Sequence, residues 1–162
     1  MLALLLPDKG KVEYYNDEET VSASPMTRCN IVYVPQGNTL ISGTIRENLL
    51  VGKSDATEDE MREALHTAVA DFVHDLPEGL DTLCGERGAG LSEGQAQRIA
   101  IARGLLRPGG VLLLDEPSSA HDSQTESLLV ERIRARLGRR TLILVTHNPR
   151  TASLCTGTVR MS

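Results

Sequence analysis

The stretch Val111-Leu112-Leu113-Leu114-Asp115-Glu116 combines an apolar strand with two acids at its carboxyl end. Its apolar part does not alternate with polar residues, which is typical of a parallel sheet that helices cover on both faces. The carboxyl edge of such a sheet is where α/β proteins bind ligands. The Asp115 and Glu116 carboxylates are therefore candidates for holding Mg²⁺ and for activating a water molecule. The alternative is a strand that ends in a solvated acidic turn.

Two other apolar runs, Ile31–Val34 and Thr141–Val145, predict further strands of the same sheet. Residues 44–107, which lie between the Ile31–Val34 run and the strand at Val111, are mainly helical in pattern and contain no obvious strand. Alternating strands and helices define an α/β fold. The sequence predicts a single domain over residues 1–162, with a sheet core at 1–43 and 108–162 and an inserted helical lobe at 44–107.

Three capping boxes predict where helices begin, because a Ser or Thr is followed three residues later by Glu or Gln. The boxes are Thr57-x-x-Glu60, Ser92-x-x-Gln95 and Ser123-x-x-Glu126. Apolar residues at helical spacing follow each of them. Arginines crowd the end of the third helix, where we expect a solvated face that complements the helix dipole. They are Arg132, Arg134, Arg136, Arg139 and Arg140.

The composition limits the classes of function. The net charge of −5 argues against a nucleic-acid-binding protein, which needs a basic surface to neutralise phosphates. The three cysteines are far apart and odd in number, which favours reduced thiols. The longest apolar run, Met1–Leu6, is too short to span a membrane, so a role at a membrane requires another polypeptide segment.

A second signal lies upstream of the acidic strand. Leu91-Ser92-Glu93-Gly94-Gln95 runs directly into a helical pattern. Free N–H groups and the positive end of the dipole make such a helix start suitable for binding phosphate. The alternative is an ordinary capped helix.

Taken together, these segments resemble the ABC ATPase family. Ser92–Gln95 is similar to the ABC signature loop, although that loop normally reads Leu-Ser-Gly-Gly-Gln. The other four elements, in family order, resemble the Q-loop (Val34-Pro35-Gln36), Walker B (Val111–Glu116), the D-loop (Pro117–Asp122) and the switch-histidine segment (Val145-Thr146-His147). This resemblance implies a P-loop NTPase sheet core, of the RecA-like type, with an inserted α-helical subdomain. Asn38–Asn48, Leu76–Thr82 and Gly85–Gly88 are similar to the exporter branch of the family.

The resemblance implies ATP and Mg²⁺ as ligands. It makes Glu116 the general base, and His147 the group that contacts the γ-phosphate. Asp115 would hold Mg²⁺ through water, and Gln36 would sense both Mg²⁺ and the attacking water.

The resemblance also implies partners. In the family, two such domains form a head-to-tail dimer, so Ser92, Gly94 and Gln95 would bind ATP held by the partner, and Asp122 would reach across the interface. A transmembrane domain outside this chain would place the protein at the cytoplasmic face of the cell membrane. Two residues depart from the family pattern: Glu93 adds a carboxylate to the signature loop, and His121 replaces a Leu of the D-loop.

The sequence contains no P-loop of the form Gly-x-x-x-x-Gly-Lys-Ser/Thr. Gly52-Lys53-Ser54 fits only superficially, because Glu47 stands at the first Gly position and the segment follows the Q-loop. Family order puts the P-loop upstream of Met1, so we expect a domain truncated at its N-terminus that binds ATP weakly or not at all. Two rivals stay open: a soluble ABC ATPase of DNA repair or translation, and a non-catalytic regulatory or interaction module.

Overall fold

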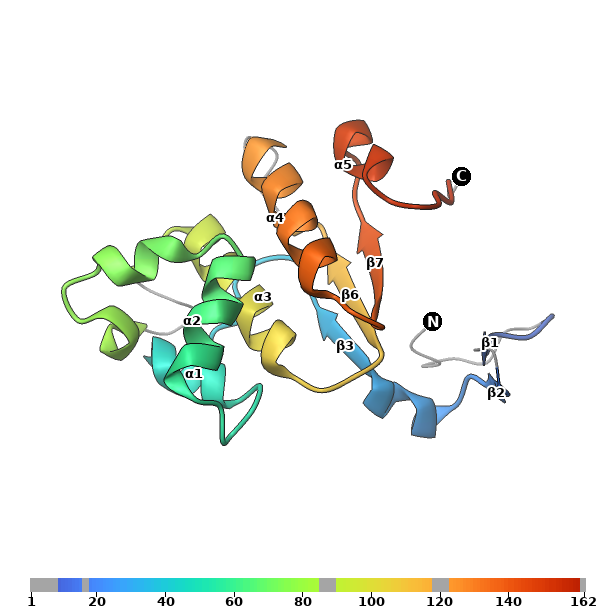
Figure 1. Cartoon of the computed structure of the whole chain (residues 1–162), viewed down its shortest axis with the longest axis horizontal. Coiled ribbons are helices and arrows are strands. Elements are labelled where there is room, and N and C mark those ends of the chain that lie inside the picture. Colours follow the sequence, from blue (N-terminus) through green and yellow to red (C-terminus); the bar gives the residue numbers. More distant parts are fainter. Residues whose placement is uncertain (1–8, 16–17, 85–89, 118–122, 161–162) are drawn as a thin grey trace.

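The computed structural model describes residues 9–15, 18–84, 90–117 and 123–160. Its central element is a parallel sheet of three strands in the order β3 (Ile31–Val34), β6 (Val111–Asp115) and β7 (Thr141–Val145) (Figure 1). Val34 pairs with Leu114 and Leu114 with Leu144, so the three strands end at the same edge. The structure confirms the predicted strands and the α/β class.

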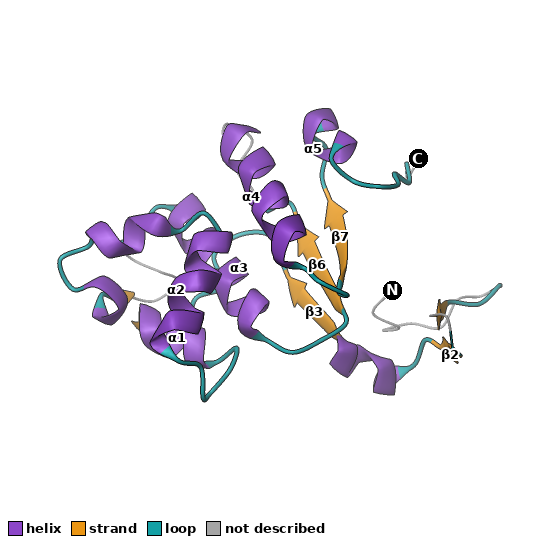
Figure 2. Cartoon of the chain, in the orientation of Figure 1, coloured by secondary structure: helices purple, strands orange, loops and turns teal. Residues whose placement is uncertain are grey.

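The other elements are helices and short strands (Figure 2). The α-helices are α1 (Ile45–Leu50), α2 (Glu58–Thr67), α3 (Glu93–Leu106), α4 (Ser123–Arg136) and α5 (Pro149–Ser153), and the 3₁₀ helices are η1 (Pro25–Asn30), η2 (Asp71–Asp75) and η3 (Gly79–Asp81). β1 (Glu13–Tyr15) pairs with β2 (Thr20–Ser22) in a separate antiparallel hairpin. Within the described residues, no helix is both long enough and apolar enough to cross a membrane.

The two faces of the sheet differ in burial. Leu112 and Leu114 of β6 are fully buried in a core that includes residues of α3 and α4. On the opposite face Leu113 and Ile143 are half-buried, and Tyr33 is 42% exposed. The prediction from the missing alternation that helices cover both faces of the sheet is therefore wrong, because the described helices pack against one face only. Absence of alternation in the sequence shows that both faces are apolar, not that both are covered.

Helix α3 is the most deeply packed helix. It contacts α1, α2, β3 and β6, and it is buried on several sides. Such a helix needs apolar residues around its circumference, as the run Ile99-Ala100-Ile101-Ala102 provides. Gly104 sets its approach to the sheet, because a Cβ there would lie 2.7 Å from Cγ2 of Val34.

The chain from Gly43 to Cys84 also contains strand pairing that the sequence did not predict. β4 (Gly43–Thr44) pairs antiparallel with β5 (Leu83–Cys84). Each strand has only two residues, too short to produce a periodic signal.

Two of the three predicted capping boxes are confirmed. Thr57 and Glu60 exchange hydrogen bonds at the start of α2, and Ser92 and Gln95 do so at the start of α3. For the third, the Ser123 side chain lies outside the described residues, and the Glu126 carboxylate binds Thr146 and Asn148.

Candidate functional site at the carboxyl edge of the sheet

The parallel register brings four of the predicted site residues to one edge of the sheet. Gln36 lies two residues beyond the end of β3, Glu116 directly follows β6, and His147 lies two residues beyond β7. Asp115 is the last residue of β6 and pairs with Val145. Because the strands are parallel and in register, residues far apart in the sequence meet at this edge.

Glu116 and His147 are in direct contact. Nδ1 of His147 lies 2.9 Å from Oε1 and 2.8 Å from Oε2 of Glu116. The hydrogen bond and the negative charge of Glu116 raise the pKa of His147 above its ordinary value of 6.5, and the charge of Glu126 adds to the effect. The contact therefore favours the imidazolium form, which can donate a hydrogen bond to an anion.

The backbone at Glu116 is in an unusual conformation. Its φ is +44°, in the left-handed region that residues other than glycine rarely adopt. The backbone N–H of Glu116 donates to the carbonyl of Val145 at 3.0 Å, which holds the residue against β7. Strain of this kind clusters at functional sites, and here it occurs where the side chain meets a histidine.

Asp115 is held by a residue that sequence reasoning missed. The Tyr33 hydroxyl donates to Oδ2 of Asp115 at 3.0 Å, across the open face of the sheet. This hydrogen bond, with smaller contributions from burial and charge, raises the pKa of Tyr33 above its ordinary value of 10.0. Tyr33 could have been found from its polar group within an otherwise apolar strand.

The donor set at this edge fits Mg²⁺ bound with phosphate. Mg²⁺ prefers oxygen ligands and usually takes one or two protein carboxylates, with substrate phosphates and water completing its shell. Asp115 supplies one carboxylate, and the side-chain amide of the exposed Gln36 can supply a further oxygen. Among the described residues no three His, Cys, Asp or Glu side chains gather as a metal site.

The loop that carries Gln36 is tied to α1 and α3. Nε2 of the buried Gln97 donates to the Pro35 carbonyl at 3.1 Å. Nη2 of Arg103 donates to the carbonyl and the hydroxyl of Thr39, and Nδ2 of the fully buried Asn48 donates to the Ile41 carbonyl. Sequence reasoning missed all three side chains, although polar residues at buried helix positions are the signal for such contacts.

The signature-like residues occupy the start of α3. The Ser92 hydroxyl accepts from the Gln95 N–H at 3.2 Å, and Oε1 of Gln95 accepts from the Ser92 N–H at 2.9 Å. Gly94 lies in the first turn, where a Cβ would meet only Nη1 of Arg98 at an ordinary 3.5 Å. Glu93 is exposed. The structure thus joins Ser92 to Gln95, separately from the contact between Glu116 and His147.

Three other predictions concern segments near these sites. Asp122 and His121 lie outside the described residues. Gly52-Lys53-Ser54 does not form a phosphate-binding loop, because it follows α1 instead of a strand and Nζ of Lys53 binds Oε1 of Glu60 at 2.5 Å.

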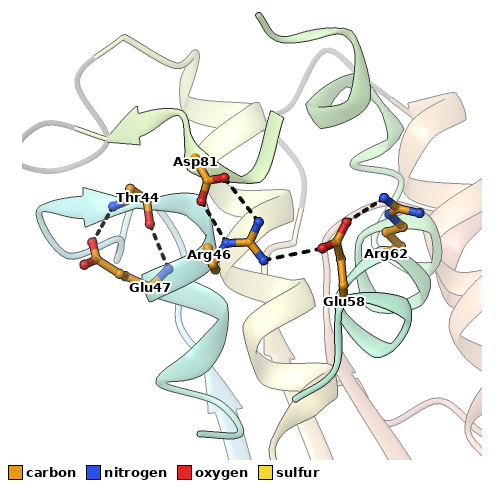
Figure 3. Close-up of polar contacts among 6 residues, drawn as sticks. All are labelled: Thr44, Arg46, Glu47, Glu58, Arg62 and Asp81. Carbon is orange, nitrogen blue, oxygen red and sulfur yellow. Dashed lines mark hydrogen bonds and ion pairs between the residues drawn. The ribbon is translucent and has the colours of Figure 1, made fainter. Parts of the chain in front are cut away.

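The two exporter-like segments that the structure describes lie together (Figure 3). Nε of Arg46 donates to Oδ1 of Asp81 at 2.8 Å, and Nη2 donates to Oδ2 at 3.2 Å. Glu58 extends the cluster, since it pairs with both Arg46 and Arg62. The two segments therefore form one polar surface instead of two independent loops.

These features define an α/β protein with an acid–histidine pair at the carboxyl edge of a parallel sheet, the class to which nucleotide-binding domains belong. The chain belongs to the ABC transporter family, whose profile matches residues 1–119.

Individual relatives agree with the family assignment. The chain is 47% identical over 133 residues to YfiB, an uncharacterised ABC transporter ATP-binding protein of Bacillus subtilis, covering 80% of this chain and 23% of YfiB. It is 43% identical over 121 residues to CydD of Escherichia coli, a glutathione/L-cysteine transport system ATP-binding/permease protein, covering 74% and 21%. A bacterial Atm1-family ABC exporter solved with ATP bound matches with a TM-score of 0.72 and 38% identity, covering 83% of this chain and 24% of the exporter. The chain thus spans less than a quarter of the length of these relatives.

Proposed function

We propose that the chain is part of the ATP-hydrolysing domain of an exporter-type ABC transporter. The observation that carries this proposal is the contact between Glu116 and His147, 31 positions apart in the sequence, at the carboxyl edge of the sheet. The family motifs assign both residues to ATP hydrolysis, and the fold brings their side chains together.

In the proposed reaction, the Glu116 carboxylate polarises the attacking water and accepts its proton. His147 contacts Glu116 through Nδ1, so Nε2 is the ring nitrogen that can donate to a γ-phosphate oxygen. Donation from an imidazolium stabilises the charge that develops on the phosphate, and the raised pKa of His147 favours that form.

Asp115 and Gln36 would hold Mg²⁺, with Asp115 acting through a water molecule. When bound, Mg²⁺ supplies charge neutralisation on the phosphates. Tyr33 orients the Asp115 carboxylate toward this edge through its hydrogen bond.

The remaining roles belong to an assembly. Ser92, Gly94 and Gln95 would bind the ATP of a second copy or a related domain in a head-to-tail dimer, and Asp122 would cross that interface. Residues 44–107 would act as a helical lobe, with a transmembrane domain as its partner at the cytoplasmic face of the membrane. The names of the relatives, which include ATP-binding/permease proteins and an exporter, support a transmembrane partner.

Mg²⁺-dependent ATP hydrolysis by the gene product tests the proposal. Membranes from cells that produce it should release phosphate from ATP faster than membranes from a deletion strain, and removal of Mg²⁺ by a chelator should abolish the difference. Equal rates in the two preparations would refute the proposed function.

A further inference from the structure

Glu126 of α4 is a buried carboxylate with an unusual set of partners. It is only 3% exposed, and burial of a carboxylate is costly unless both oxygens are hydrogen-bonded. Oε1 accepts from the Thr146 hydroxyl at 2.9 Å, and Oε2 accepts from Nδ2 of Asn148 at 2.8 Å. Both donors are neutral, and they are the residues immediately before and after His147.

The contacts continue on both sides of His147. The Asn148 N–H donates to the Thr146 hydroxyl oxygen at 3.0 Å, and Oδ1 of Asn148 accepts from the Arg150 N–H at the start of α5. The segment from Thr146 to Arg150 is thereby fixed to α4 through one carboxylate.

His147 depends on this support, because its own side chain is 71% exposed and is not fixed by packing. An exposed ring can keep its contact with Glu116 only if the backbone that carries it is held in a single conformation. In a catalytic site, a misplacement of about 1 Å can cost about 100-fold in rate.

We propose that Glu126 is a positioning residue that sets the place of His147 by holding both of its neighbours in the chain. The role rests on the proposed function, since it concerns the placement of a catalytic histidine. Glu126 does not touch the reacting atoms; it acts through Thr146 and Asn148.

The principal test is a double-mutant cycle on Mg²⁺-dependent ATP hydrolysis by the gene product. Glu126→Gln should lower kcat about 10- to 100-fold with little change in KM for ATP. In a His147→Ala background the same substitution should cause no further loss, because the residue that Glu126 positions is gone. Glu131→Gln, an exposed acid on the same helix, makes the same change of charge and should leave kcat unchanged.

A swap of the two partners tests the hydrogen bond itself. Asn148→Asp keeps an acceptor for the Arg150 N–H but places two carboxylates against each other, so kcat should fall. Adding Glu126→Gln restores a donor–acceptor pair, since the new amide on α4 donates to the new carboxylate at position 148, and kcat should recover to within a few-fold of the wild-type rate. If Glu126→Gln alone folds too poorly to assay, the double variant still tests the hydrogen bond between positions 126 and 148.

A readout that needs no ATP separates this inference from the proposed function. The ¹⁵N shift of Nδ1 of His147 should move toward that of an unbonded imidazole in Glu126→Gln and stay unchanged in Glu131→Gln. An equal loss of kcat in both backgrounds, no recovery in the swapped pair, or an unchanged ¹⁵N shift would overturn the role of Glu126. Absence of hydrolysis in the wild type would refute the proposed function, while the ¹⁵N shift would still decide the positioning.

Discussion

The two ends of the parallel sheet use polar side chains in opposite ways. At the amino edge, Arg140 donates to the backbone carbonyls of Leu105, Arg107 and Gly109, and Oδ1 of Asn30 accepts from the Gly110 N–H at 2.6 Å. At the carboxyl edge, the side chains of the candidate site bind one another, as Glu116 does with His147 and Tyr33 with Asp115.

Polar side chains at the amino edge stabilise the fold, whereas those of the candidate site are available to a ligand. The Arg140 guanidinium donates to carbonyls at the end of α3 and in the turn after it, and burial lowers its pKa below the ordinary value. Its donors satisfy the main chain, which would otherwise leave unpaired acceptors. The groups at the carboxyl edge satisfy one another, so a ligand can replace one partner without exposing the backbone.

The largest effect on stability is expected at the amino edge. Arg140→Met should lower the free energy of unfolding by about 2–3 kcal/mol, because several carbonyls lose a charged donor. Arg139→Met, at the exposed neighbour, should change it by no more than about 0.5 kcal/mol. Chemical denaturation of the two variants measures the difference, and equal values would remove the structural role given to Arg140.

The position of α3 against the sheet determines where the carbonyls that Arg140 binds are located. Gly104→Ala should cost about 1–3 kcal/mol, since the new methyl group would overlap Val34. Gly157→Ala is a matched control, because nothing lies within 4 Å of the added carbon. Thermal unfolding should show a lower Tm only for the first variant; an unchanged Tm would mean that α3 shifts freely against β3.

At the carboxyl edge, Glu116→Gln should change the pKa of His147 more than the free energy of unfolding. The pKa of His147 should fall toward its ordinary value, because the partner that raises it is gone. Since the folded-state pKa is raised, the pair stabilises the fold at low pH, and this contribution disappears as pH rises through that pKa. NMR titration of the His147 ring measures the shift, and a pKa unaffected by the substitution would show that the contact is not formed in solution.

The smallest effect concerns the start of α3. Glu93→Gln should lower stability by about 0.3–1 kcal/mol, because a carboxylate in the first turn interacts favourably with the helix dipole. The loss should shrink at high salt. Denaturation at two salt concentrations checks it, and a gain in stability would indicate that Glu93 repels its surroundings.

Features that depend on residues close together in the sequence could be predicted, whereas contacts between distant residues could not. The strand from Val111 follows from an apolar run that can be recognised in one sequence. The roles of Glu116 and His147 came from the family resemblance, and their contact is seen only in the structure. Thr57-x-x-Glu60 and Ser123-x-x-Glu126 look alike in the sequence, yet the Glu60 carboxylate caps its own helix, whereas the Glu126 carboxylate binds partners 20 and 22 residues away. The prediction that Arg140 lies on a solvated helix end is wrong for the same reason: its acceptors lie at the end of α3 and in the turn after it, 31 to 35 residues upstream.

The most direct test of the central claim is the rate of Mg²⁺-dependent ATP hydrolysis in the Glu116→Gln variant of the gene product, with Glu131→Gln as control. General-base catalysis typically contributes about 10²- to 10⁴-fold, so Glu116→Gln should lose that factor while Glu131→Gln hydrolyses ATP at the wild-type rate. Hydrolysis by Glu116→Gln at the wild-type rate would contradict the assignment of the carboxyl edge as the catalytic site.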